Sequence, residues 1–309
     1  MPAFPFRPSA IPGKRARTVP LAKVSVIAAG QAHRRNWSLA AGVPMYDFVF
    51  DGPTTLAGLL VGAIVGVTGV GGGALMTPIL VLAFGVAPHT AVGTDLVFAS
   101  LTKVFGVAIH HRHDTVDWQV VRRLALGSLP AAAMTLAWMR LGGADQMRGG
   151  LVMKALAVAL LITAVGMVLK TRLHHVGRTW RVGQPDRFKH LQPMFTVSAG
   201  FVLGALVTLT SIGAGALGTV MLVYLYPFRM SHNRLVGTDL AHAIPLTFVA
   251  GLGHLVMGNV DVMLLGNLLA GSIPGVLAGS LVGARAPVSV VRAAIAAVLA
   301  AVAVRILAA

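Results

Sequence analysis

Val-Gly-Thr-Asp-Leu at residues 92–96 occurs a second time at residues 236–240, and this repetition determines how the fold is interpreted. Starting from these two copies, the chain aligns with itself without a gap over 39 positions, of which 13 are identical. The identical positions include aspartate, histidine and proline, which shared hydrophobicity alone does not reproduce. The chain therefore contains two copies of one structural unit, offset by 144 residues.

A second matching pair of stretches lies upstream of the first. Residues 68–75 and 210–217 both read Thr-x-x-Gly-x-Gly-Ala-Leu. Each half thus has a glycine-rich stretch that is followed by the repeated aspartate. A duplicated hydrophobic bundle with a broken segment and an acid in each half is typical of secondary transporters.

The composition predicts a membrane protein. Hydrophobic residues make up 56% of the chain and charged residues only 11%. Long apolar stretches recur from residue 54 to the end, and about 20 apolar residues in a helix cross the hydrocarbon core of roughly 30 Å. A soluble domain of this length needs a more highly charged surface. We therefore expect an all-α polytopic membrane protein with two homologous halves of four to five transmembrane helices each, eight to ten in total.

Two of the predicted helical segments, 74–87 and 215–227, are too short to cross the membrane upright, because they reach only about 20 Å. Each follows a glycine-rich break, so we expect a bend near mid-membrane and then a short helix. Backbone of this kind is tolerated at depth only where it is buried in protein or lines a polar cavity. The remaining apolar segments are 54–70, 92–110, 118–139, 151–169, 194–211, 236–257, 262–283 and 288–307.

The chain divides into a basic N-terminal tail (1–46), a first transmembrane repeat (47–169), a basic cytoplasmic linker (170–193) and a second transmembrane repeat (194–309). The tail contains seven Lys or Arg residues and no acid. Three interpretations are open for it: a disordered cytoplasmic tail, an unusual targeting segment, or untranslated sequence upstream of a true start at Met45. We favour the start at Met45.

The topology depends on how many times each half crosses the membrane. Five crossings make the halves inverted, and most loop and linker arginines then face the cytoplasm. Four crossings make the halves parallel and leave the pairs Arg229/Arg234 and Arg285/Arg292 outside. Because positive residues accumulate on the cytoplasmic side, we favour the inverted repeat.

Several function classes are disfavoured by composition. The chain has no cysteine, which excludes disulfides, thiolate metal sites and cysteine nucleophiles. Residues 110–113 contain three histidines, but neighbouring side chains on a helix point apart, so we expect no metal there and no cofactor. The net charge of +16 favours anions and anionic lipids, although bases in loops mainly signal topology. The linker lacks a nucleic-acid reading surface, so we expect no nucleic-acid partner.

The two glycine-rich stretches are candidate anion sites. Free backbone N–H groups beside a helix N-terminus bind anions without a cationic side chain. The alternative role is close helix packing through small residues, and we favour the anion site because the stretch is duplicated ahead of a short helix. The candidate substrate-binding residues are Thr68, Gly69, Gly71, Gly72, Gly73, Thr94, Lys103, Thr210, Ser211, Gly213, Gly215 and Thr238.

The repeated acids are candidates for coupling or gating. We expect Asp95 and Asp239 each to lie in the first turn of a long helix, after a threonine N-cap. Acids within membrane spans are costly and usually functional, so proton binding is a second interpretation. Lys103 lies well inside its helix and can pair with the anion or extend to an interface. His242 follows Asp239 by three residues and can pair with it, and we include it among the coupling candidates.

These residues together resemble the sulfite exporter TauE/SafE family of membrane transporters. The likeness rests on Gly-Val-Thr-Gly-Val-Gly-Gly-Gly at 66–73, on Ala-Val-Gly-Thr-Asp-Leu at 91–96, and on their second-half counterparts, and it covers about residues 54–307. It implies a bacterial inner-membrane carrier for small sulfur-containing anions such as sulfite or organosulfonates. It also implies that the glycine-rich segments line the substrate path. The second half departs from the first by Ser211 and Ala214 in place of two glycines.

The sequence and the resemblance favour the same function. We expect a secondary transporter, most simply an exporter, whose small anionic substrate binds between the two repeats and moves by alternating access. An anion channel is the alternative. An intramembrane enzyme needs a nucleophile–base pair or a metal cage, and the scattered His and Ser residues have no convincing spacing. The expected partners are the anion and the lipid bilayer.

Overall fold

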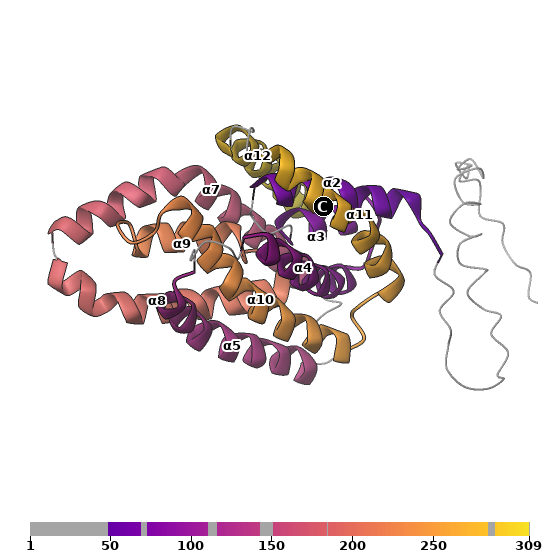
Figure 1. Cartoon of the computed structure of the whole chain (residues 1–309). Helices are drawn as coiled ribbons and strands as arrows, with labels where there is room; N and C mark the ends of the chain where they lie inside the picture. The colour runs from indigo at the N-terminus through magenta and orange to yellow at the C-terminus, as the bar shows by residue number, and fades with distance from the viewer. Residues whose placement is uncertain are drawn as a thin grey trace, which may run out of the picture. The chain divides into compact units, whose positions relative to one another are not determined.

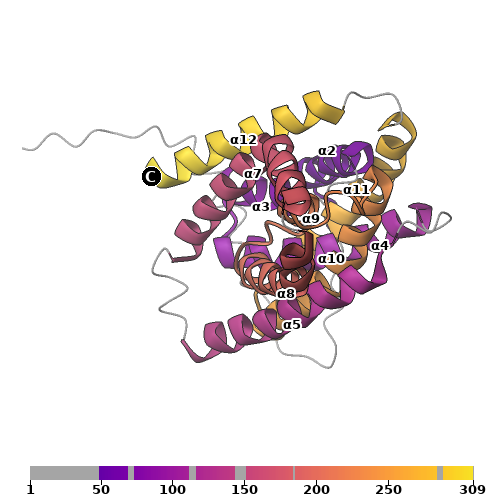
Figure 2. The same cartoon turned by 90° about the vertical axis from the view of Figure 1, so that its left-hand side faces the viewer.

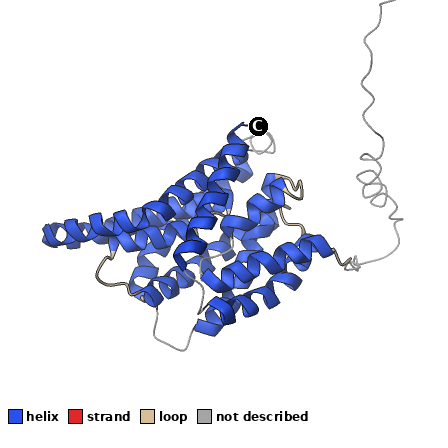
Figure 3. Ribbon diagram, turned by 90° about the horizontal axis from the view of Figure 1, so that it is seen from above, coloured by secondary structure: helices blue, strands red, loops and turns tan. Residues whose placement is uncertain are grey.

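The computed structural model describes residues 49–68, 73–110, 116–142, 151–183, 185–283 and 288–308. Over these ranges the chain is built from α-helices joined by short loops and contains no strand (Figure 3). Five of the described helices, α5, α7, α8, α10 and α11, have stretches long and apolar enough to cross a bilayer. The prediction of a polytopic α-helical membrane protein is confirmed.

The helices of the two halves follow the same order. The predicted short helices are present as the second helix of each half, and each is ten residues long. The first half contains α2 (Gly52–Thr68), α3 (Gly73–Leu82), α4 (Pro88–His110), α5 (Trp118–Leu141) and α7 (Leu151–Gly183). The second half contains α8 (Pro185–Thr210), α9 (Ala216–Leu225), α10 (His232–Val256), α11 (Val262–Gly283) and α12 (Val288–Ala308).

The two halves are interlocked rather than packed side by side. The first helix of each half packs against the fourth helix of the other half, which gives the pairs α2–α11 and α8–α5. Between these pairs, α4 packs against α10, and α7 packs against α12 (Figures 1 and 2). Each main helix contact therefore joins equivalent helices of the two halves or has an equivalent contact with the two halves exchanged.

Glycines allow the backbones of α2 and α11 to touch. Gly58, Gly62 and Gly66 recur every four residues on α2 and so lie on one face. A Cβ at any of the three would lie within 3 Å of a backbone carbonyl oxygen of α11. Gly271, Gly275 and Gly279 of α11 face α2 backbone carbonyls in the same way.

The α5–α8 pair is built on the matching positions. A Cβ on Gly200 or Gly204 of α8 would collide with the carbonyl of Leu124 or Ser128 in α5, and one on Gly127 would collide with that of Val197. Small residues with this spacing let membrane helices approach closely and gain van der Waals contact. These two glycine-lined pairs hold the halves together.

A backbone break separates α8 from α9. Ser211, Gly213 and Gly215 have φ angles of 59°, 117° and 129°, which reverse the helical path and end α8 at Thr210. Glycine adopts such angles without steric cost, whereas serine does so at some strain. The corresponding first-half residues, 69–72, lie outside the described ranges.

The predicted starts of two long helices were wrong. α4 begins at Pro88 and α10 at His232, so the repeated Val-Gly-Thr-Asp stretches lie inside the helices rather than at N-caps. Proline is favoured in the first helical turn. In α10 the cap is Ser231, whose hydroxyl accepts a hydrogen bond from the Arg234 backbone N–H.

The basic segment predicted as a linker, residues 170–193, is helical on both sides of residue 184. It consists of the end of α7 and the beginning of α8. The short helix α9 lies between these two long helices (Figure 1).

Alanine at Gly271 is expected to destabilise the protein by about 1–3 kcal/mol, because the added methyl group overpacks the α2–α11 contact. The matched control is Gly166→Ala in α7, where a Cβ would meet Leu217 and Val220 at an ordinary 3.6–3.8 Å. Thermal unfolding of both variants in detergent, followed by tryptophan fluorescence, provides the measurement. Equal melting temperatures for the two variants would contradict the backbone contact.

Candidate functional site

A buried lysine joins the two halves at the backbone break. Lys103 of α4 is only 3% exposed. Its Nζ donates a hydrogen bond of 3.3 Å to the carbonyl oxygen of Ala214, within the break before α9. The lysine from the first half thus contacts the break in the second half, and a role of Lys103 in substrate binding stays a prediction.

Two buried carboxylates, one from each half, accompany this lysine. Asp95 lies on α4 and Asp239 on α10, exposed by 0% and 2%. Lys103 interacts electrostatically with both. Among the described residues, however, neither carboxylate lies within the 4.0 Å of Lys103 Nζ that an ion pair requires. The Oδ1 atom of each carboxylate accepts no hydrogen bond from the described part of the chain.

The two carboxylates differ in their surroundings. The Thr77 hydroxyl of α3 donates a hydrogen bond of 2.5 Å to Asp95 Oδ2. The matching threonine of α9, Thr219, instead donates to the Ala216 carbonyl of its own helix, at 2.8 Å. Gly218 presents its bare backbone to Asp239 Oδ1, where a Cβ would collide. Asp95 therefore has a hydroxyl donor at a position where Asp239 has none.

His242 also lies in this region, but its partner is not the predicted one. Its Nε2 is 2.8 Å from the Ser128 hydroxyl of α5, and no hydrogen bond to Asp239 is found in the described part of the chain. The first-half position that matches His242 is Phe98. The matching serine, Ser272, is buried and has no hydrogen-bond partner among the described residues. The two halves thus have different polar contacts at equivalent places.

The repeated threonines tie the halves together. Thr94 Oγ1 accepts a hydrogen bond of 3.0 Å from the backbone N–H of Asp261. Thr238 Oγ1 accepts one of 2.9 Å from the backbone N–H of Asp117. Each threonine therefore holds the residue that precedes the fourth helix of the opposite half, and a role in substrate binding stays a prediction.

The residues of the break have mixed environments. Thr210 donates to the Leu206 carbonyl at 2.6 Å and accepts from the Ile212 N–H at 3.2 Å. The Ser211 hydroxyl is buried beside Asp95 and has no partner of its own in the described ranges. In the first half, Thr68 ends α2 and Gly73 begins α3. The candidates Gly69, Gly71 and Gly72 lie outside the described residues.

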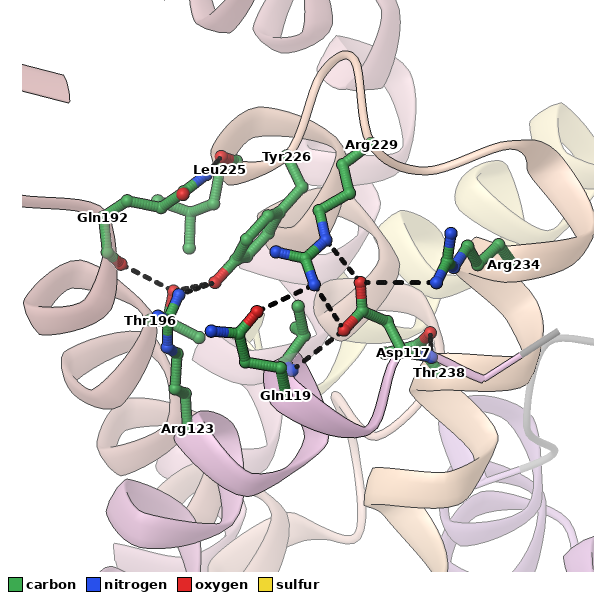
Figure 4. A network of polar contacts seen from close by, with 11 residues as sticks. Asp117, Gln119, Arg123, Gln192, Thr196, Leu225, Tyr226, Arg229, Arg234 and Thr238 are labelled. Atoms are coloured by element: carbon green, nitrogen blue, oxygen red, sulfur yellow. Dashed lines mark hydrogen bonds and ion pairs between the residues drawn. The ribbon is translucent and has the colours of Figure 1, made fainter. Parts of the chain in front are cut away.

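A polar network that the sequence analysis did not identify lies between the loops before α5 and α10 (Figure 4). Asp117 caps α5, with its side chain accepting from the Val120 N–H. Arg229 pairs with it, with Nε 2.5 Å from Oδ2 and a second nitrogen donating to Oδ1 at 2.9 Å. A guanidinium nitrogen of Arg234 lies 3.9 Å from Asp117 Oδ2. The pair joins the first half to the second.

The network continues around Tyr226. Its hydroxyl lies 2.8 Å from the Thr196 hydroxyl and accepts a hydrogen bond of 3.3 Å from Arg123. The Arg229 guanidinium stacks at 5.9 Å from the ring centre and also donates to Gln119. The counterpart of Asp117, Asp261, has no ion pair among the described residues. Within the described ranges, this ion pair is therefore found at only one of the two equivalent loops.

Comparisons with known proteins indicate a membrane transporter. The family description "Sulfite exporter TauE/SafE" matches residues 54–306. "Probable membrane transporter protein YjnA" from Bacillus subtilis (strain 168) is 41% identical over 218 residues, which cover 69% of this chain and 82% of that protein. "Probable membrane transporter protein YdhB" from the same organism is 25% identical over 211 residues, 67% of this chain and 79% of that protein. No solved structure matches.

The family match extends from the start of α2 almost to the end of α12. It includes both glycine-rich stretches, both repeated aspartates and Lys103. The resemblance inferred from these motifs is thereby confirmed. The chain is a multi-pass membrane transporter that belongs to the sulfite exporter TauE/SafE family.

Proposed function

We propose that this protein is a secondary carrier of the bacterial inner membrane that moves small sulfur-containing oxyanions such as sulfite or organosulfonates. Export is the direction that the family description favours. The single observation that supports an anion site most strongly is the buried ammonium of Lys103 at the backbone break. A buried lysine within a membrane span is costly and usually functional.

The break supplies further groups that suit an oxyanion. α9 begins directly after Gly215, and no side chain caps its N-terminus. The positive end of a helix and its free N–H groups favour negative charge. The Ser211 hydroxyl adds a donor without a partner in the described ranges. In this proposal the oxyanion displaces the Ala214 carbonyl from Lys103 and takes the ammonium as its partner.

Lys103→Met is expected to lower saturable sulfite exchange in proteoliposomes at least tenfold, because it removes the buried positive charge that attracts the anion to the break. Lys154→Met is the control, since Lys154 is an exposed lysine of α7. Counterflow of labelled sulfite against unlabelled sulfite provides the measurement, and it also separates a carrier from a channel. Equal exchange by the two variants would contradict the site, and flux without counterflow would favour the channel.

The interlocked helices suggest which parts move. The backbones of α2 and α11 touch, as do those of α5 and α8, so neither pair separates easily. Each pair takes one helix from each half. We therefore propose that alternating access moves one glycine-lined pair relative to the other, rather than the first sequence half against the second.

We propose that the Asp117–Arg229 pair, which joins the loops before α5 and α10, restrains the opening of the protein. In a Ser211→Cys background, Arg229→Gln is expected to increase the reaction rate of the new thiol with a water-soluble reagent about fivefold. Arg229 is 41% exposed and Asp117 only 3%, and an ion pair with a solvent-exposed partner contributes about 1 kcal/mol. Ser211 is only 2% exposed, so the reagent reaches this position when the protein opens. The chain contains no native cysteine that would interfere.

Gln119→Ala is the matched control, because it removes a neutral contact to the same Arg229 and leaves the ion pair in place. The rate with Gln119→Ala is expected to equal that of the Ser211→Cys background alone. An unchanged rate with Arg229→Gln would show that this pair does not limit opening.

A further inference from the structure

The charges of the buried cluster oppose the binding of an anion. Asp95, Lys103 and Asp239 are each at most 3% exposed. With both acids ionised, these three groups carry a net charge of −1, and an anion adds another negative charge. Uncompensated charge in a low-dielectric interior is expensive, so a further positive charge has to enter with the anion.

We propose that the carrier is an electroneutral anion–proton cotransporter in which Asp239 binds one proton for each monovalent anion that binds at Lys103. This inference rests on the proposed function and adds its coupling ion. The proton adds to Asp239 Oδ1 and leaves from it, and no bond in the anion changes. Because one negative and one positive charge enter together, the net charge of the cluster is the same with and without its ligands.

Asp239 suits this role better than Asp95 for a structural reason. The Thr77 hydroxyl donates to Asp95, and a donated hydrogen bond stabilises an ionised carboxylate. The Oδ1 atom of Asp239 faces the backbone of Gly218 and accepts no hydrogen bond from the described residues. Asp239 therefore loses less hydrogen-bond stabilisation than Asp95 when its carboxylate is protonated.

The other titratable groups around Asp239 fit a single proton site. Lys103 of α4 and Lys170 of α7 both interact with Asp239 electrostatically. Lys170 is only partly buried, so it is not counted in the net charge of the buried cluster. His242 on the same helix forms a hydrogen bond with the Ser128 hydroxyl. The helices that pack against α10 are α4, α5, α8 and α9. Among their described residues, Lys103 is the charged group that acts on Asp239.

Coupling of this kind determines the direction of net flux. A proton gradient directed into the cell drives the anion inward through such a carrier. Net export then requires an outward anion gradient larger than the proton gradient. The direction follows from the two gradients and not from an asymmetry of the protein.

The test uses the full-length protein in proteoliposomes with labelled sulfite at a mildly acidic pH, at which the monovalent hydrogensulfite is the main species. The wild type is expected to exchange sulfite at equal pH and to show net flux that an imposed inside-negative potential does not change. Uncoupled movement of a monovalent anion would instead shift the equilibrium ratio about tenfold for every 59 mV. Net flux that follows the potential in this way would overturn the proposal.

Asp239→Asn is expected to keep sulfite exchange and to lose net flux at least tenfold, because a neutral amide cannot release a proton on the empty return step. Asp51→Asn, at an exposed helix start, is the matched control and is expected to keep both. Equal net flux in Asp239→Asn and Asp51→Asn would overturn the proposal. If Asp239→Asn does not fold, the potential dependence of the wild type decides alone. Absence of sulfite exchange in the wild type would reject the carrier function itself.

Discussion

The hydrogen bond from Lys103 to the Ala214 carbonyl is the interaction on which the arrangement of the two halves around the site depends. A lysine in the interior of a membrane protein needs polar partners, because an unpaired buried charge costs several kcal/mol. A broken helix likewise needs partners for the backbone groups that it frees. The lysine and the break each supply what the other lacks. An isolated first half would leave Lys103 without this acceptor, and an isolated second half would leave the Ala214 carbonyl without this donor.

The remaining contacts between the halves are of two kinds. The glycine-lined pairs α2–α11 and α5–α8 are rigid, because backbone lies directly against backbone. The threonine hydroxyls that hold Asp261 and Asp117 are single hydrogen bonds, which are worth about 1 kcal/mol each and break easily. A carrier needs both rigid units and weak joints, and the interlocked arrangement provides them with the same residues repeated in each half.

The repeated residues allowed much of this arrangement to be predicted. The glycine-rich stretches indicated two breaks followed by short helices, and the structure has α3 and α9. The duplicated aspartates and Lys103 were chosen as candidates, and they lie in one buried cluster. The predicted starts of α4 and α10 were wrong because apolar periodicity does not show that α4 already begins at Pro88 and that Ser231 caps α10. The linker 170–193 is helical, although its basic composition suggested only that it is solvated.

Other parts of the site could not be read from local patterns. Arg229 and Asp117 are 112 positions apart in the chain, and only the fold brings them together. The contacts of Thr77 and Ser128 were missed although both have matching residues in the second half. Their partners differ between the halves, so the repeat alone could not assign their roles.

The most direct test of the central claim is to locate the anion. Selenite is a heavier analogue of sulfite, and its selenium scatters anomalously, so it marks the bound position in crystals of the native protein. We predict one anomalous peak within about 4 Å of Lys103 Nζ, so that a selenite oxygen accepts a hydrogen bond from the ammonium. The peak lies beside the break at residues 211–215 and is lost in Lys103→Met. A peak only at the Arg229–Arg234 cluster, or none at saturating selenite, would contradict an anion site between the halves.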